Sequence, residues 1–192
     1  MCAHSKEIID KFRDLCDRLM QIWQMRKYLF DDNPDRSALF APRNRLFFVH
    51  IQEVLQESWL HQLAKLHDPA VQGGAKGHIN LSIDYMIEYG HWKPEVKVAL
   101  NDLKTKMEVL AKPIRDARNK ILAHNDLAVL LAGQELGGFN PGEDETYFLN
   151  LREFAHLVTT TALGEEQPFT TYDCVKTDVH VFMRAFLKGK LD

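Results

Sequence analysis

The chain has 192 residues, 45% of them hydrophobic, which is enough for one domain to bury a core without disulfides or structural metal ions. Its formal net charge of −3 argues against a protein that holds nucleic acid through overall charge. No window reaches the ~20 consecutive apolar residues of a membrane span, residues 1–10 lack the apolar region of a secretory signal, and the cysteines Cys2, Cys16 and Cys174 have no CxxC spacing. We therefore expect a single domain over residues 1–192, cytoplasmic and without membrane contact.

Apolar residues at helical spacing predict a first helix between a cap at Ser5 and a turn at 31–34. The same kind of spacing predicts a second long helix from about Ser37 to His67, ended by Asp68-Pro69. The glycine-rich segment 73–77 then reads as a loop. It does not meet the requirements of a phosphate-binding P-loop, because no strand precedes it and no Lys-Ser/Thr pair follows.

Asn80 is expected to cap a short helix that stops near Gly90, and Pro94 suits the first position of a long helix. The apolar stripe of this long helix continues to about residue 131. Pro113 lies inside the stripe and predicts a kink or break near 109–113.

The last part of the chain begins with a loop at 133–145 that is rich in Gly, Asn and Pro. Residues 147–149 are expected to be briefly extended, and Asn150 with Glu153 predicts a capping box that opens a helix to about Ala162. A final helix starts at Thr170 or Thr171. No alternating run is long enough for a sheet, so the sequence predicts an all-α, up-down bundle of about five to seven helices.

Positive charge is concentrated between Lys93 and Lys120, where eight cations face four carboxylates, a net +4 in an acidic chain. A solvated helix face explains most runs of this kind. The excess is of interest because it ends in the string Arg118-Asn119-Lys120-Ile121-Leu122-Ala123-His124.

The residue types in this string suit metal-free cleavage of RNA, which needs proton transfer to and from two oxygens and a cation at the phosphorus. His124 is a candidate for the proton transfers, because histidine is the side chain whose unperturbed pKa, about 6.5, suits proton transfer near neutrality. Arg118 presents a planar set of donors that matches phosphate oxygens. Asn119 adds an amide donor and Lys120 a further positive charge.

Helix geometry limits what one copy of this string can do. On a regular helix Arg118 and His124 would lie about 120° apart around the axis and ~9 Å apart along it. They cannot converge on one phosphate from a straight helix. Either the helix is irregular near 119–125, or two chains combine their motifs across a two-fold axis in a homodimer.

Other interpretations of the same residues stay open. His124 falls on the apolar stripe and could be a buried, hydrogen-bonded histidine, and Arg118 could pair on the surface with Asp116, Asp126 or Glu108. Asp126 could be a helix cap. The chain could also be a binding module without catalytic activity. A metalloenzyme is disfavoured, because His61, His67, His78 and His91 lack paired helical spacing and no HExxH occurs.

The segment 115–126 resembles the R-x(4–6)-H signature of the HEPN superfamily, in which asparagine usually follows the arginine. Leu63-Ala64-Lys65-Leu66-His67-Asp68-Pro69, then a glycine loop, then Asn80-Leu81-Ser82-Ile83, looks like the HEPN branch associated with phage abortive infection. The resemblance spans roughly residues 40–130, and the order of helices agrees outside it.

The resemblance implies a helical bundle that dimerises through its motif helices. It also implies metal-independent endoribonuclease activity, used by many members in toxin–antitoxin systems or anti-phage defence, while other members are inactive RNA-binding, nucleotide-binding or protein-interaction modules. Arg118 would hold the scissile phosphate, His124 would transfer protons, and Asn119 would orient the phosphate or the histidine.

The resemblance also bears on partners. We expect Arg115, Lys120, Lys112 and Asp126 to belong to the RNA- and phosphate-binding surface, with no cofactor and no metal. Any antitoxin that neutralises the activity would be a separate protein, because the chain has no fused nucleotidyltransferase or antitoxin domain.

Overall fold

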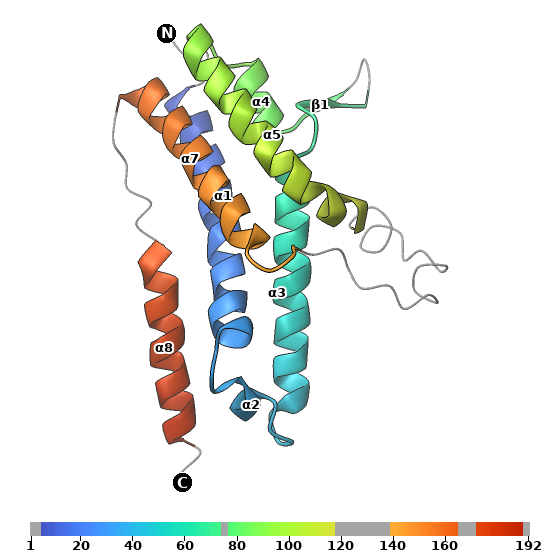
Figure 1. Cartoon of the computed structure of the whole chain (residues 1–192), viewed down its shortest axis with the longest axis vertical. Coiled ribbons are helices and arrows are strands. Elements are labelled where there is room, and N and C mark those ends of the chain that lie inside the picture. Colours follow the sequence, from blue (N-terminus) through green and yellow to red (C-terminus); the bar gives the residue numbers. More distant parts are fainter. Residues whose placement is uncertain (1–4, 74–76, 118–138, 165–171, 190–192) are drawn as a thin grey trace. The chain divides into compact units, whose positions relative to one another are not determined.

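The computed structural model describes residues 5–73, 77–117, 139–164 and 172–189, and nearly all of their regular structure is helical (Figure 1). No helix in these ranges is long and apolar enough to cross a bilayer. The all-α class predicted from the sequence is confirmed. The α-helices are α1 (Lys6–Arg26), α2 (Arg36–Leu39), α3 (Arg45–Leu66), α4 (Ile83–Glu88), α5 (Pro94–Ala117), α7 (Glu143–Leu163) and α8 (Tyr172–Lys188).

The first helix ends in a π-helical turn, η1 (Lys27–Asp31). In a π-helix each N–H donates to the carbonyl five residues earlier, instead of four as in an α-helix. Here the Asp32 N–H donates to the Lys27 carbonyl at 2.8 Å. Two ion pairs also join residues five positions apart: Arg26 with Asp31 at 3.0 Å, and Lys27 with Asp32 at 3.4 Å. The turn brings Phe30 into the core, where it is 1% exposed.

The predicted helix from Ser37 to His67 is wrong as a single element, because the structure divides it into α2 and α3. Pro42 lies between the two helices and lacks the N–H that a continuous helix would need there. The Asn44 N–H donates to the Ala41 carbonyl at 2.9 Å, which closes a tight turn before α3 begins.

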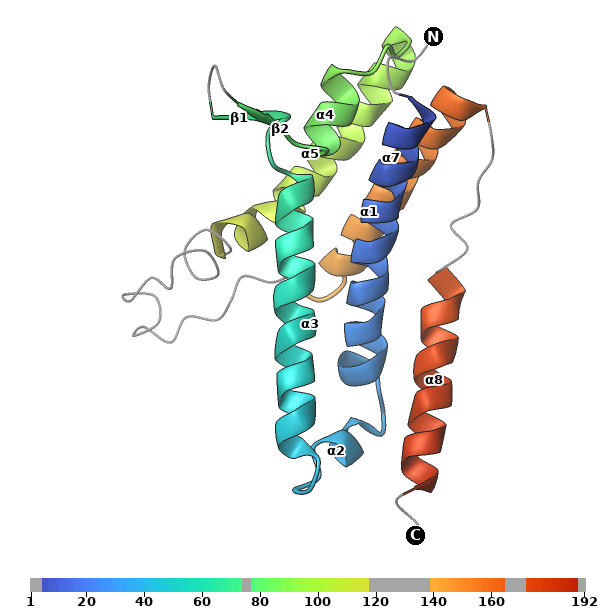
Figure 2. The same cartoon turned by 180° about the vertical axis from the view of Figure 1, so that it is seen from behind.

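The segment around the glycine loop holds two short strands that the sequence did not predict, β1 (Val71–Gln72) and β2 (His78–Ile79). They pair antiparallel, Val71 opposite Ile79, and form a small hairpin (Figure 2). Asn80 is not the cap of α4, since its side-chain amide donates to the Pro69 carbonyl at 2.9 Å.

Ser82 caps α4 instead of Asn80. Its hydroxyl accepts from the Tyr85 N–H at 3.3 Å. A short polar side chain at this position accepts a hydrogen bond from one of the backbone N–H groups that have no partner within the helix. The sequence predicts this role for Asn80.

Helix α7 starts earlier than the sequence predicts. α7 begins at Glu143, so the predicted extended stretch at 147–149 and the capping box at Asn150 are both wrong. Asn150 lies inside the helix, and its amide donates to the Thr146 carbonyl one turn earlier at 2.9 Å. The local pattern was misleading because Tyr147 and Phe148 are buried helix residues rather than strand residues.

Pro113 does not break α5, which continues to Ala117. The ribbon changes direction in its last turns (Figure 1). A proline ring crowds the carbonyl four residues earlier and removes one hydrogen bond, so bending without a break is the expected compromise in a well-packed helix. α5 is therefore one helix up to Ala117, with Pro113 inside it.

The chain divides into two compact units, Met1–Cys16 with Leu60–Pro168 and Asp17–Trp59 with Phe169–Asp192. In the first unit α5 packs along α7. Its core includes Phe12 of α1, whose ring centroid lies 5.8 Å from that of Phe154 in α7. Both rings are 1% exposed or less, and burying a side chain of this size contributes about 1.5–3 kcal/mol.

The second unit has its own apolar core, formed by η1, α2, the first part of α3, and α8. Phe48 of α3 contacts Phe186 of α8 edge-on, with ring centroids 5.4 Å apart. The buried members of this core are Phe30, Leu39, Phe48, Val179 and Met183. The final helix predicted from 170 or 171 is thus present as α8 and packs within this unit.

Gly90, which follows α4, leaves no room for a side chain. The Trp92 indole Nε1 donates to the Met86 carbonyl at 2.7 Å, and a Cβ on Gly90 would lie 2.2 Å from that nitrogen. We expect Gly90→Ala to lower the free energy of unfolding by roughly 1–3 kcal/mol, measured by urea denaturation. The control is Gly189→Ala, whose Cβ would meet its nearest atom at 3.7 Å and should change stability by less than ~0.5 kcal/mol. Equal effects of the two would contradict the steric account.

Candidate functional site

Most of the site residues predicted from the sequence lie outside the described residues. Arg118, Asn119, Lys120, His124 and Asp126 all fall in the segment 118–138. The structure does place Lys112 and Arg115, which belong to the last turns of α5. The described part of the candidate site is the end of α5 with the side chains around it in the first unit.

Lys112 is an exposed cation held by a neighbour on its own helix. Its Nζ lies 2.8 Å from an Asp116 carboxylate oxygen, and the two side chains are 74% and 54% exposed. A pair this exposed contributes little to stability, so both groups remain accessible to a ligand. Asp116 offsets part of the positive charge that the sequence showed in this region.

Arg115 is half-buried, unlike the exposed Lys112–Asp116 pair beside it on the helix. Its positive charge acts on His67, the residue that follows α3, and adds to the effect of burial in lowering the pKa of that imidazole. The predicted phosphate-binding arginine therefore lies near a buried histidine, which its spacing in the sequence disfavoured as a metal ligand.

His67 forms a buried hydrogen bond with Tyr147 of α7. The imidazole Nε2 and the phenol oxygen are 3.0 Å apart, and the two residues are separated by 80 positions in the chain. His67 is 5% exposed and Tyr147 is 0% exposed. This contact joins the end of α3 to the helix that packs along α5.

The protonation states of the pair follow from their burial. Burial, together with the positive charges of Arg115 and Lys104, lowers the pKa of His67 to about 3. Burial also raises the pKa of Tyr147 well above its usual value, with a smaller contribution from Cys16. Near neutral pH the imidazole is uncharged and the phenol keeps its proton, which it can donate to Nε2.

Lys104 of α5 connects this helix to α4 through an ion pair. Its Nζ lies 2.6 Å from an Asp84 carboxylate oxygen and 3.5 Å from one of Glu108. Burial favours the uncharged amine, but the hydrogen bonds and charges of Asp84 and Glu108 outweigh it and raise the pKa of Lys104. Lys104 therefore stays charged, which adds to the cost of protonating His67.

The chemical role open to the His67–Tyr147 pair is support rather than proton transfer to a polymer. A neutral imidazole with a pKa near 3, almost without solvent contact, cannot act as an acid or base on an RNA chain. It can fix the end of α3 against α7 beside the charged end of α5. Among the residues that the structure describes, no group of three or more His, Cys, Asp or Glu side chains could hold a metal ion.

The comparisons with known proteins agree with the resemblance seen in the sequence. The chain matches the family model described as AbiU2, of the HEPN type, over residues 5–174. This range contains all of α1, α3, α4, α5 and α7, and it also contains the motif from Arg118 to His124. Searches of curated proteins and of solved structures gave no match.

Proposed function

Because the chain belongs to the AbiU2 family, a HEPN-type abortive-infection family, we propose that it is a metal-independent endoribonuclease of the toxin or anti-phage kind. The observation that carries the proposal is that the family match includes the Arg118–His124 motif. The substrate is single-stranded RNA. The proposal includes a homodimer and allows a separate antitoxin protein that neutralises the activity.

The proposed chemistry assigns one role to each motif residue. His124 takes the proton of a ribose 2′-hydroxyl or returns a proton to the leaving 5′-oxygen, in proportion to its neutral and charged forms. The 2′-oxygen attacks phosphorus as the bond to the 5′-oxygen breaks, which leaves a 2′,3′-cyclic phosphate and a 5′-hydroxyl. Arg118 holds the phosphate and stabilises the charge that develops on its oxygens, while Asn119 donates an amide hydrogen bond.

The test is an assay of end-labelled single-stranded RNA with purified protein in excess EDTA. We expect cleavage, with a 2′,3′-cyclic phosphate on the upstream product. RNA that binds but stays intact would favour the alternative, an inactive RNA-binding module of the same family. Cleavage that EDTA abolishes and added metal restores would contradict the proposed chemistry.

The homodimer is tested by mixing two inactive variants. If Arg118 of one chain works with His124 of the other, a heterodimer of Arg118→Ala and His124→Ala keeps one intact Arg–His pair. Free reassortment should then restore about a quarter of the wild-type activity, since about half of the dimers are mixed and each holds one of two pairs. If both residues act within one chain, mixing restores nothing.

The exposed pair at the end of α5 gives a prediction about RNA affinity. Lys112→Gln should weaken binding of RNA of any sequence and reduce the slope of log K against log salt by about 0.7. Asp116→Asn removes the opposing charge and should strengthen binding. Both should leave the free energy of unfolding within ~0.5 kcal/mol of wild type, because their side chains are 74% and 54% exposed. Filter binding at several salt concentrations measures the effect, and unchanged affinity in both variants would remove Lys112 from the RNA surface.

A further inference from the structure

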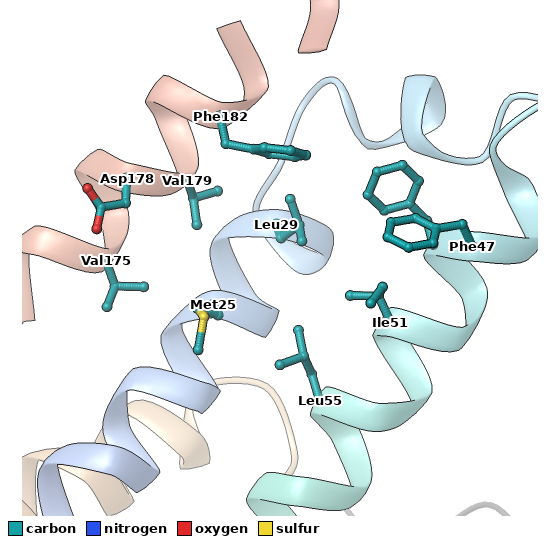
Figure 3. A pocket seen from close by; sticks show the side chains of 10 residues that line it. Met25, Leu29, Phe47, Ile51, Leu55, Val175, Asp178, Val179 and Phe182 are labelled. Carbon is teal, nitrogen blue, oxygen red and sulfur yellow. The ribbon is translucent and has the colours of Figure 1, made fainter. Parts of the chain in front are cut away.

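Two cavities of similar size differ in what their linings can recognise. The cavity of the second unit, about 400 Å³, is lined by apolar side chains, and Asp178 points away from it (Figure 3). The cavity of the first unit, about 360 Å³, lies between α1, the last turns of α3, and β2 with the residues that follow it. Its lining includes four polar side chains, Gln62, Lys65, Asp68 and Asn80. Polar groups that converge on a cavity of this size are what select one small ligand from another.

The polar groups of the first-unit cavity are held by α3 and by the hairpin. Gln62 and Lys65 are three positions apart on α3 and so lie on the same face of the helix. Asn80 is fixed twice, because its backbone N–H donates to the Ala70 carbonyl and its side-chain amide donates to the Pro69 carbonyl, both at 2.9 Å. The oxygen of this amide can still accept a hydrogen bond from a ligand.

Lys65 and Asp68 give the lining one positive and one negative side chain. Lys65 is exposed, and within the described ranges it forms no ion pair with a carboxylate, that of Asp68 included. An ammonium group only donates hydrogen bonds, and an ionised carboxylate only accepts them. A ligand that satisfies both groups therefore presents acceptors to Lys65 and donors to Asp68.

The rest of the lining is apolar and comes from Leu15, Leu66, Ile79 and Leu81. Ile79 is 66% exposed, so a ligand that covers it removes apolar surface from water. A volume of about 360 Å³ holds about a dozen non-hydrogen atoms, at the ~30 Å³ that one water molecule occupies in the liquid. These properties fit a flat ring of purine size, with polar edges and apolar faces.

We propose that this cavity binds a guanine base. Guanine has two neighbouring acceptors, O6 and N7, beside two neighbouring donors, the N1–H and the 2-amino group. Lys65 donates to O6 and N7, and Asp68 accepts from the N1–H and the amino group. Adenine, cytosine and uracil do not offer two neighbouring donors to a carboxylate, so Asp68 discriminates against them. The apolar side chains contact the faces of the ring.

Two sources offer this base, a free guanine nucleotide and a single-stranded RNA. Asp68 directly follows His67, on which the positive charge of Arg115 acts, so the cavity and the end of α5 lie at the same end of α3. An RNA source rests on the proposed function and would give the nuclease a preference for RNA that contains guanine. Recognition of the base itself does not depend on cleavage, and the experiment below is carried out without it.

The experiment is isothermal titration calorimetry of the full chain in EDTA with the four nucleoside 5′-monophosphates, which carry the same phosphate and differ only in the base. Guanosine monophosphate should bind about 5–150-fold more tightly than the other three, the range of one good two-point base contact. Inosine monophosphate, which lacks the 2-amino group, and 7-deazaguanosine monophosphate, which lacks the N7 acceptor, should each bind more weakly than guanosine monophosphate.

The RNA source is tested with 2′-O-methyl uridine hexamers, which cannot be cleaved, with and without one central guanosine. A guanine preference in the hexamers alone assigns the site to RNA, and one of equal size in the monophosphates assigns it to a free nucleotide. Absence of a guanine preference in both series would overturn the proposal. The proposed nuclease would be unaffected by that result, because it is tested separately by cleavage in EDTA.

Two variants locate the base in the cavity. Asp68→Asn should remove the difference between the guanosine and inosine probes, and Lys65→Gln should remove the effect of the 7-deaza change. Their matched controls are Asp102→Asn and Lys106→Gln, exposed positions on α5 outside the lining, which should leave every affinity within twofold. Thermal unfolding checks that each variant is folded. A guanine preference that survives in both cavity variants would contradict the assigned site.

Discussion

Replacing His124 with alanine is expected to lower the rate of RNA cleavage about 10²–10⁴-fold, the usual contribution of a general acid or base. Arg118→Ala should cause a loss of similar size, because it removes the cation that stabilises charge at phosphorus. The two losses should not add in the double variant, since the residues act on one transition state. Initial rates on labelled RNA in EDTA measure all three.

The control variants replace a histidine and an arginine that are exposed and lie outside the motif. His156→Ala and Arg43→Ala each remove an exposed side chain and should leave cleavage unchanged. Thermal unfolding of every variant separates loss of activity from loss of the fold. If His124→Ala keeps wild-type rates while folded, the motif is not the catalytic centre and the binding-module alternative gains support.

The second large effect is on stability in acid. His67 has a pKa of about 3 in the folded chain, against about 6.5 for an unperturbed histidine. Between these values the unfolded state binds a proton that the folded state does not, so the free energy of unfolding falls as the pH falls from 6.5 to 3. The loss attributable to this one group should reach roughly 3–5 kcal/mol, and it is absent above pH 6.5.

A His67→Gln variant isolates this contribution from that of the carboxylates. Glutamine can still hydrogen-bond to the Tyr147 hydroxyl but does not titrate. Urea denaturation should show the variant less stable than wild type at pH 7, and the difference should shrink or reverse at pH 4. A difference that stays constant with pH would show that His67 is protonated in the fold or open to solvent.

The helices that the sequence predicted well are those with a long, one-sided apolar stripe. Residues such as Phe12, Leu100 and Met107 are buried as their spacing required. The predictions were wrong where a local sequence signal, such as a helix cap, could be placed at either of two neighbouring residues. Asn80 and Ser82 are both good caps, and only the backbone path, which brings Asn80 to the Pro69 carbonyl, decides between them.

The candidate site divides in the same way. The motif from Arg118 to His124 can be read from the order of residues, because its signature is a fixed spacing of residue types along the sequence. The His67–Tyr147 contact cannot, because its partners are 80 positions apart and only the packing of α3 and α7 brings them together. The one local signal was a histidine directly before Asp-Pro at a helix end, and on its spacing it was considered only as a disfavoured metal ligand.

Because of the π-helical turn at Lys27–Asp31, the burial of Phe30 depends on the number of residues in this part of the chain. With one more residue in its hydrogen-bonded turn than an α-helix, it places the last side chains of the helix, Phe30 among them, about 100° around the axis from their α-helical positions. Deleting a single amino acid here would restore the ordinary repeat and rotate Phe30 away from its buried position. A deletion of the same size between Phe40 and Asn44, where no helix is continuous, would leave the faces of both flanking helices intact.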